Sequence, residues 1–518
     1  MMYDALIFGK ANIPGIVNIE VDGDKAFLFV QDKEGTIETK LVPNKYWILS
    51  ETQIDKSWVR LTGELHYKWG KQYSTREDFQ KYRGIYGKRY DTTTVWSAQE
   101  ALMIKDGYTY YQGLQPKDIS LMSIDIETTG LNAFANDAKL LAVSTTFRNS
   151  KQELIKKSFY YDEYQTQKKM LLSLQDHIIK LNPSLIIGHN IISFDIPYMS
   201  GIAEQEGITL NWGRDNSEIK FESRESNFRL DGTRNLHYKN CTIFGREIVD
   251  TYFLSIKYDV SKSMESYGLK PMIKQLGMEA PNRTFYDASL IRENYKIPSE
   301  WALIKAYCVD DADDAIKLWD LMGPLFFFTC QMVPKPFNKV ILGASGSQIN
   351  SMMMRAYLQD RHSLPKTTEI KSFEGALSWG QPGIYNNVMK VDVASLYPSI
   401  ILQYEVYDKE KDPKAYLLTL VKKFRANRLE YKRLAAETGL QSYKDMDTAA
   451  KGILNSFYGF FAASGLSFNS MACAEFITAK GREILEKAIV WATGKEFRDI
   501  APDYYAQKES DVTDLEEE

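Results

Sequence analysis

LMSIDIET, residues 121–128, is an apolar stretch that carries two carboxylates, Asp125 and Glu127. Side chains alternate between the two faces of a β-strand, so both carboxylates should lie on one face while Ile124 and Ile126 point into the core. One strand could then offer two ligands to a metal ion. Such a pair is common on solvated strand edges, so it indicates a site only together with other motifs.

Two further polar motifs follow in the chain. NIISFD, residues 190–195, comes after the apolar segment SLIIGHN, at the point where a helix should begin. YCVDD, residues 307–311, places Tyr307 and Asp311 one helical turn apart on one face. Each alone has a plainer interpretation, with Asp195 as a helix cap and Asp311 as a surface charge.

The surrounding pattern predicts several domains. Short alternating segments before residue 115, among them KAFLFVQD, TKLVPNKYWIL and YTYYQG, indicate a mostly β domain. From about residue 116, apolar strands alternate with helical stretches such as 164–181, which is typical of an α/β sheet. Residues 205–245 are polar and predict an insertion or hairpin.

The C-terminal third contains a second group of candidates. VMKVDVASLY, residues 388–397, predicts a strand that carries Asp392, and helices are expected at 345–363, 412–437, 443–464 and 470–492. Residues 422–433 hold six positive charges and one negative. Lys451, Asn455 and Tyr458 share one helical face, and the preceding helix offers Arg428 and Lys432. A solvated basic face is the alternative interpretation of this cluster.

These motifs together resemble the family B DNA polymerases. The order DxE, NxxxFD, YxxxD is similar to the three exonuclease motifs of that family, of the ribonuclease H-like DEDDy type. DVASLYPSI (392–400) resembles the first palm motif, KGILNSFYG (451–459) resembles the fingers motif, and FEGA (373–376) resembles the linker between exonuclease and palm, with phenylalanine where tyrosine is usual.

The resemblance implies a multidomain protein of α/β and α+β class. Its expected parts are a mostly β N-terminal domain (1–115), a ribonuclease H-like 3′–5′ exonuclease domain (116–335), a partial palm (336–404), helical-hairpin fingers (405–465), and a palm helix with an acidic tail (466–518).

The resemblance also implies roles for individual residues. In the exonuclease, Asp125, Glu127 and Asp311 would bind metal, Asp195 would support a metal through water, Tyr307 would orient the attacking water, and Asn190 and Phe194 would hold the DNA end. In the polymerase, Asp392 would bind metal and Gly375 and Gly459 would contact DNA. The residues implied to bind the nucleotide are Leu396, Tyr397, Arg428, Lys432, Lys451, Asn455 and Tyr458.

The chemistry accounts for these residue types. In-line cleavage of a phosphodiester needs a nucleophilic water and stabilisation of the leaving oxygen, which two divalent ions supply. Hard Mg²⁺ or Mn²⁺ prefers carboxylate oxygen. We therefore expect two such ions in each active site.

The third palm motif of the family, a DTD between apolar strands, is not found. Its only candidate, Asp511 to Asp514, has polar flanks and is interpreted as part of a solvated acidic tail. The expectation is thus the large part of a split, proofreading DNA polymerase, completed by a second polypeptide with the missing carboxylate and the thumb.

Open alternatives are a piece of a longer protein, a stand-alone 3′–5′ DNA exonuclease with a vestigial palm, and a non-catalytic DNA-binding assembly subunit. The expected partners are primer–template DNA, single-stranded 3′ ends and dNTPs, and a sliding clamp is left open.

The composition excludes some classes of protein but does not identify a function. The chain has 518 residues, of which 44% are apolar and 25% charged, as in ordinary globular proteins. It has neither an apolar run of about 20 residues nor a signal peptide at its start, so an intracellular location is expected, in cytoplasm, nucleoid or, for a virus, host cytoplasm. The four cysteines lie far apart, which argues against zinc and iron–sulfur sites, and the net charge of −4 does not identify a nucleic-acid binder.

Overall fold

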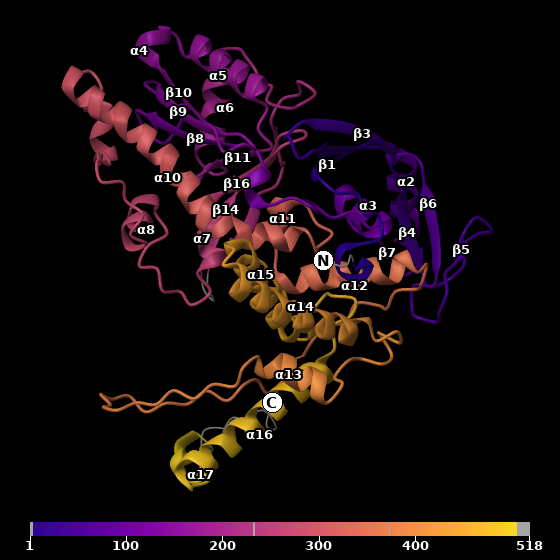
Figure 1. Ribbon diagram of the computed structural model, residues 1–518. Helices are drawn as coiled ribbons and strands as arrows, with labels where there is room; N and C mark the ends of the chain where they lie inside the picture. The colour runs from indigo at the N-terminus through magenta and orange to yellow at the C-terminus, as the bar shows by residue number, and fades with distance from the viewer. Residues whose placement is uncertain (1–3, 231–233, 372, 505–518) are drawn as a thin grey trace.

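The computed structural model describes residues 4–230, 234–371 and 373–504 (Figure 1). Its N-terminal part contains a three-stranded antiparallel sheet, ordered β1-β2-β3, and a four-stranded sheet, ordered β5-β6-β4-β7. This confirms the mostly β character expected there. The elements are α1 (Ala5–Phe8), β1 (Ile16–Asp22), β2 (Lys25–Gln31), β3 (Ile37–Pro43), β4 (Tyr46–Ser50), β5 (Val59–Arg60), β6 (Trp69–Tyr73), α2 (Arg76–Tyr86), β7 (Thr92–Thr93) and α3 (Ala98–Asp106).

YTYYQG, residues 108–113, is not a strand, contrary to its pattern. Tyr111 has a φ of 58°, which an extended strand does not allow. The rings of Tyr110 and Tyr111 are fully buried. The backbone N–H of Tyr110 donates to the Cys330 carbonyl oxygen, and that of Tyr111 donates to the Ile16 carbonyl oxygen. The aromatic residues therefore fasten β1 to the end of a distant helix, which is a tertiary role that alternation cannot reveal.

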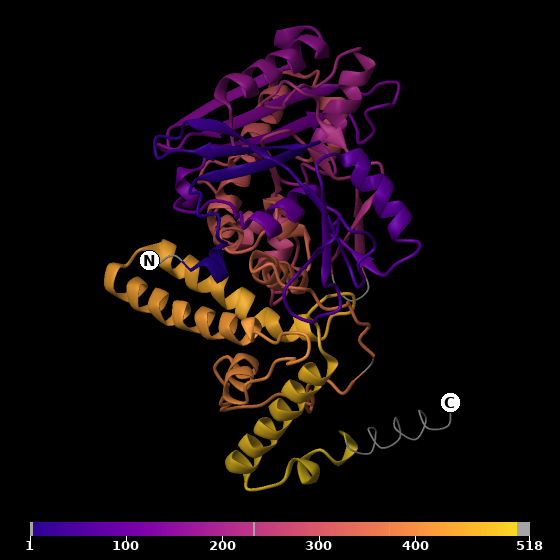
Figure 2. The same cartoon turned by 90° about the vertical axis from the view of Figure 1, so that its right-hand side faces the viewer.

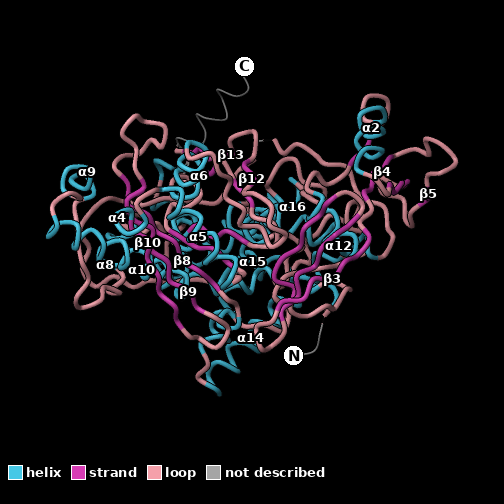
Figure 3. Tube along the Cα trace, turned by 90° about the horizontal axis from the view of Figure 1, so that it is seen from above, coloured by secondary structure: helices cyan, strands magenta, loops and turns pink. Residues whose placement is uncertain are grey.

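A five-stranded mixed sheet, ordered β10-β9-β8-β11-β16, forms the centre of the next part (Figure 3). β8 pairs in parallel with β11, which pairs in parallel with β16, whereas β9 and β10 are antiparallel additions. The carboxyl ends of the three parallel strands thus meet at one edge. The strands are β8 (Leu121–Thr128), β9 (Leu140–Arg148), β10 (Leu154–Tyr160), β11 (Leu185–Gly188) and β16 (Glu247–Asp250), preceded by η1 (Pro116–Asp118).

Helices cover this sheet, and the long helix α10 (Pro298–Cys330) packs on β8 and β9 (Figure 1). The expected polar insertion is a small β region that includes the hairpin β13–β14. The other elements here are α4 (Tyr161–Tyr164), α5 (Gln167–Leu181), α6 (Asp195–Gln205), β12 (Lys220–Phe221), β13 (Ser226–Arg229), β14 (Asn235–Tyr238), β15 (Cys241–Thr242), α7 (Thr251–Tyr258), α8 (Leu269–Gln275), η2 (Ala288–Leu290) and α9 (Ile291–Asn294).

The C-terminal part is helical, and its hairpin α14–α15 lies between the upper body and α16 (Figure 2). The hairpin matches the expected helices, and Gly439 ends α14 in the left-handed conformation with a φ of 69°. The elements are α11 (Phe337–Leu342), α12 (Ser345–Gln359), α13 (Leu396–Gln403), α14 (Tyr416–Thr438), α15 (Gln441–Phe461), α16 (Met471–Thr493) and α17 (Phe497–Ile500).

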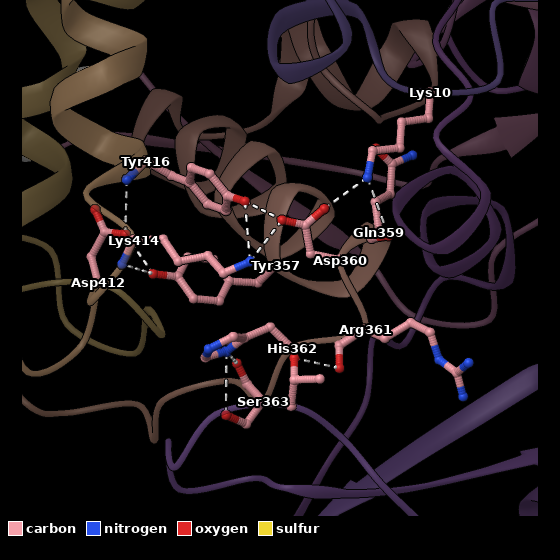
Figure 4. Close-up of polar contacts among 11 residues, drawn as sticks. Lys10, Tyr357, Gln359, Asp360, Arg361, His362, Ser363, Asp412, Lys414 and Tyr416 are labelled. Atoms are coloured by element: carbon pink, nitrogen blue, oxygen red, sulfur yellow. Dashed lines mark hydrogen bonds and ion pairs between the residues drawn. The ribbon is translucent and has the colours of Figure 1, made fainter.

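A polar cluster anchors the base of α14 to the rest of the chain (Figure 4). The Asp360 carboxylate, just after α12, pairs with Lys10 at 2.7 Å and with Lys414 at 2.8 Å, and it accepts a hydrogen bond from the Tyr416 hydroxyl. Asp412 caps the start of α14 by accepting from two backbone N–H groups and from the Tyr357 hydroxyl. Three segments distant in the sequence therefore meet at this point.

The strand expected at 388–397 is wrong. Residues 388–395 form neither helix nor strand, and α13 begins at Leu396. The segment before it extends away from the body (Figure 1), and most of its side chains are exposed. An extended segment becomes a strand only beside a hydrogen-bonding neighbour, and the described residues place none there.

In the described part of the chain, no helix combines the length and the apolar character that crossing a membrane requires.

Candidate active sites

The first site forms where β8 ends. Its alternation buries Ile124 and Ile126 and turns Asp125 and Glu127 to the other face, as expected. Asp125 is partly buried and Glu127 is 7% exposed. The DxE pair therefore lies at largely buried positions on the central strand of the sheet and not on a solvated strand edge.

The NIISFD loop follows β11 directly beside this strand. Asp195 is the first residue of α6 and is buried against the backbone of Ile126, so it is not the helix cap of the plainer interpretation. Gly188 is required at the strand end because a β-carbon there would meet the Ile124 carbonyl oxygen at 2.8 Å. Asn190 is exposed with a φ of 67°, and Phe194 is half-buried against the ring of Tyr198, with centroids 5.6 Å apart.

Helix α10 brings the third motif to the same place. Tyr307 and Asp311 are both buried, at 2% and 5% exposure. The Lys270 ammonium donates a hydrogen bond to the Tyr307 hydroxyl and lies 3.0 Å from one Asp311 oxygen. The Arg283 guanidinium pairs with the other Asp311 oxygen and, at 2.7 Å, with Asp314. The structure thus unites all three exonuclease-like motifs.

Burial raises the pKa of all four carboxylates of the site. Burial raises the pKa of Asp125 well above its usual range, and the negative charges of Asp311, Glu127 and Asp195 add to the shift. Burial raises the pKa of Glu127 in the same way and raises the pKa of Asp195 to about 8. For Asp311, burial raises the pKa although Lys270 and Arg283 oppose it. The arrangement concentrates acidic groups where water screens them poorly.

This donor set fits divalent metal ions. Asp125 Oδ2 is buried and has no hydrogen-bond partner among the described residues. Asp125, Glu127 and Cys308 each offer one possible ligand atom, and these atoms lie within 4.8 Å of one another. Burial raises the pKa of the Cys308 thiol well above its ordinary value, so the thiol stays protonated and the carboxylates are the donors suited to a hard cation.

Three residues of this site were missed in the sequence: Asp250, Lys270 and Arg283. Asp250 ends β16 and accepts from the backbone N–H groups of Asn190 and Ile192 at 2.8 and 3.1 Å, which fixes the NIISFD loop. The apolar segment EIVD before a helix was a readable signal for Asp250. Lys270 and Arg283 are single cations in ordinary contexts, and no pattern in the sequence points to them.

The second site joins the palm-like and fingers-like motifs. The ring of Tyr397 on α13 contacts that of Tyr458 on α15, with centroids 4.7 Å apart. Gly481 on α16 leaves room for Tyr397, because a β-carbon there would approach its ring to 3.1 Å. Arg428 on α14 donates to Ser395 Oγ at 3.3 Å and to Asp447 Oδ1 at 2.8 Å. The predicted proximity of the motifs is present.

The remaining predicted residues of this site are accessible. Lys432, Lys451, Asn455 and Gly459 are exposed on the helical hairpin, and Leu396 is half-buried. Asp392 is exposed and borders a pocket of about 450 Å³ between the 376–397 segment and α16. Gly375 is held at its carbonyl oxygen by Arg482. Asp511 and Asp514 lie outside the described residues.

Comparisons with known proteins identify the family. The family model for the exonuclease domain of DNA polymerase family B matches residues 102–272, and the model for DNA polymerase family B matches residues 403–512. DNA polymerase 1 of Pyrococcus abyssi is 21% identical over 420 residues, which cover 73% of this chain and 52% of that protein. The DNA polymerase of Pyrococcus glycovorans is 24% identical over 361 residues, covering 63% of this chain and 44% of that protein.

The fold is also found in a solved structure. The family B DNA polymerase from the hyperthermophilic archaeon Pyrobaculum calidifontis aligns with a TM-score of 0.74 at 17% identity, covering 92% of this chain and 71% of that one. The chain spans about half the length of the curated relatives it matches.

Proposed function

Since the chain belongs to the family B DNA polymerases, we propose that its first site is a proofreading exonuclease that removes nucleotides from single-stranded 3′ ends of DNA. The observation that carries this proposal is the convergence of Asp125, Glu127, Asp195 and Asp311, with one Asp125 oxygen that has no hydrogen-bond partner among the residues that the structure describes. Such a set of buried carboxylates is unfavourable unless cations compensate it.

Each residue has a defined task in this proposal. Asp125, Glu127 and Asp311 would hold Mg²⁺ or Mn²⁺, two ions in all, which when bound activate water and stabilise the leaving oxygen. The Tyr307 hydroxyl, held by Lys270, would orient the attacking water. Asn190 is exposed and Phe194 is half-buried on the loop that leads to Asp195, and the aromatic ring would stack on a terminal base.

The test is the double variant Asp125→Ala, Glu127→Ala on a 5′-labelled single-stranded oligonucleotide with Mg²⁺. We expect degradation by the native chain and a loss of at least about 100-fold in the variant, because the carboxylates of one site act together. Glu204→Ala, at an exposed position on α6, is the matched control and should retain the native rate. Undiminished degradation by the double variant would exclude this site.

We further propose that the second site binds a dNTP for template-directed DNA synthesis. Lys432 and Lys451 present exposed ammonium groups on the hairpin, and positioned cations stabilise the charge that develops in phosphoryl transfer. Tyr397, packed between Tyr458 and Gly481, would contact the sugar. Asp392 would be the first metal-binding carboxylate of the palm.

Nucleotidyl transfer would need a further carboxylate beside Asp392. We propose that a second polypeptide with a carboxylate-bearing hairpin and a thumb covers the pocket next to it. Met389, Val391 and Trp491 line this pocket with 85%, 67% and 82% of their surfaces exposed, which is unusual for side chains of this type. Covering them would also give residues 388–395 the neighbour that a strand requires.

Primer extension tests the two-chain proposal. This chain alone should not extend a primer, whereas addition of a polypeptide that carries the hairpin and thumb of a relative should restore extension. Extension by this chain alone at the rate of intact relatives would contradict it. If the chain degrades single-stranded DNA and the added polypeptide does not restore primer extension, the chain is instead a stand-alone exonuclease. The exposure of Asp392 is the observation that favours this alternative. Binding to a sliding clamp stays a prediction.

A further inference from the structure

Arg428 already has a negative partner within the fingers-like hairpin. Its Nε lies 2.8 Å from Asp447 Oδ1 on the facing helix, and its side chain is 12% exposed against 19% for Asp447. A second guanidinium nitrogen donates to Ser395 Oγ at 3.3 Å. The pair thus joins α14, α15 and the palm-like motif, and it can still be reached from solvent.

The neighbouring cations differ from Arg428. Lys432 and Lys451 are exposed, and within the described residues neither has an ion-pair partner. Asp447 precedes Lys451 by four positions on α15, so its carboxylate lies on the same helical face as the Lys451 ammonium. One carboxylate therefore lies beside Arg428 and near Lys432 and Lys451, the three cations that the family resemblance assigns to nucleotide binding.

We infer that Asp447 is an internal counter-ion that a triphosphate must displace from Arg428, and that it thereby lowers the affinity of the hairpin for nucleotides. This inference rests on the proposed nucleotide-binding function. Carboxylate and phosphate oxygens compete for the same guanidinium N–H groups. Binding would exchange one charge-assisted hydrogen bond of Arg428 for another.

The rival explanation is that Asp447 only holds α14 and α15 together. The two explanations differ in what removal of the carboxylate does to anion binding. If Asp447 is purely structural, its replacement should weaken anion binding or leave it unchanged, because Arg428 loses its support. If Asp447 is a counter-ion, its replacement should strengthen anion binding, because the Arg428 guanidinium no longer has a competing partner.

The experiment is a calorimetric titration of the full chain with inorganic tripolyphosphate, without divalent metal. Asp447→Asn should bind about tenfold more tightly than the native chain, which corresponds to one charge-assisted hydrogen bond no longer broken on binding. Asp447→Glu keeps the carboxylate and should bind like the native chain. Glu437→Gln, which removes one carboxylate from the Arg433 cluster on α14, is the matched control and should change nothing.

A double-mutant cycle separates a specific effect from general electrostatics. In an Arg428→Ala background, Asp447→Asn should give no gain, because the inferred competition needs the guanidinium. A gain that persists there would overturn the inference, as would equal or weaker binding by Asp447→Asn alone. Far-ultraviolet circular dichroism of each variant checks that the helical hairpin is intact.

The outcomes distinguish this inference from the proposed function. Equal binding by the native chain and Asp447→Asn, combined with a loss in Lys451→Ala, would overturn only the role of Asp447. Absence of binding in the native chain and in Asp447→Asn would overturn both.

Discussion

The Asp250 carboxylate accepts hydrogen bonds from the backbone N–H groups of Asn190, Ile192 and Tyr252 at 2.8, 3.1 and 2.9 Å. It therefore serves two elements at once, because it caps α7 and fixes the loop that delivers Asp195 to the site. At the scale of single residues, this side chain therefore helps to set the geometry of the carboxylate cluster.

Asp250→Ala tests that dependence. We expect the free energy of unfolding to fall by roughly 1–3 kcal/mol, since buried N–H groups lose their acceptor. We also expect slower degradation of single-stranded DNA, because the loop shifts. Urea denaturation and single-turnover degradation measure the two effects. Asp250→Asn retains one acceptor oxygen and should fall between the native chain and Asp250→Ala; equality of all three proteins would contradict this role.

Gly188 permits a close approach of two segments at the same strand end. A β-carbon would meet the Ile124 carbonyl oxygen and the Ile191 β-carbon, each at 2.8 Å, so Gly188→Ala should destabilise the protein by roughly 1–3 kcal/mol. Gly452→Ala is the control on α15, where nothing lies within 4 Å, and it should stabilise that helix by about 0.5–1 kcal/mol. Thermal unfolding of both variants checks the opposite signs.

At the scale of elements, the hairpin α14–α15 depends on its base. Asp360 lies at the end of α12 and binds Lys10, Lys414 and Tyr416, which come from two other segments (Figure 4). These cations hold the pKa of Asp360 well below its usual range despite partial burial. The carboxylate therefore ties the hairpin to the N-terminal part of the chain.

Asp360→Ala should weaken the attachment of the hairpin to the N-terminal part of the chain. We expect the free energy of unfolding to fall by roughly 1–3 kcal/mol, because two cations and a hydroxyl lose a shared acceptor. Hydrogen exchange should accelerate in residues 412–420 more than in β8. Glu483→Gln removes an exposed carboxylate from two surface ion pairs on α16 and serves as control, with no change expected near α14. Unchanged hydrogen exchange in residues 412–420 would show that the contacts of Asp360 do not stabilise the start of α14.

At the scale of the whole molecule, a buried carboxyl links the N-terminal part to the exonuclease-like part. Glu247 on β16 is 5% exposed and accepts a hydrogen bond from Asn18 on β1 at 3.0 Å. Burial raises its pKa from 4.5 to about 7. Between these two values the folded protein binds more protons than the unfolded chain, so the free energy of unfolding falls as pH rises from about 4.5 to about 7.

Glu247→Gln removes this titration and keeps an acceptor for Asn18. The variant should gain stability relative to the native chain as pH rises, with a difference between pH 5 and pH 8 of roughly 1–3 kcal/mol. Thermal unfolding across this pH range measures it. The exposed control Glu204→Gln should follow the native curve, and parallel curves for Glu247→Gln would contradict the role of burial.

The sequence by itself determined the elements whose pattern is local. Alternation in LMSIDIET fixed β8, and the helical spacing of the Lys451 motif fixed which face of α15 is buried, since both patterns depend only on near neighbours. The motifs also predicted, through family resemblance, that Asp125, Glu127, Asp195 and Asp311 belong to one site, and these four carboxylates do lie close together.

The tertiary structure decided whatever depends on a distant partner. Residues 388–395 have a strand-like sequence and no strand, because no neighbour completes the ladder, and YTYYQG packs its aromatic rings between two distant elements. Asp250, Lys270, Arg283 and Asp447 are ordinary charges in the sequence. They acquire roles only because folding brings them within hydrogen-bonding distance of groups that lie 19 to 60 residues away.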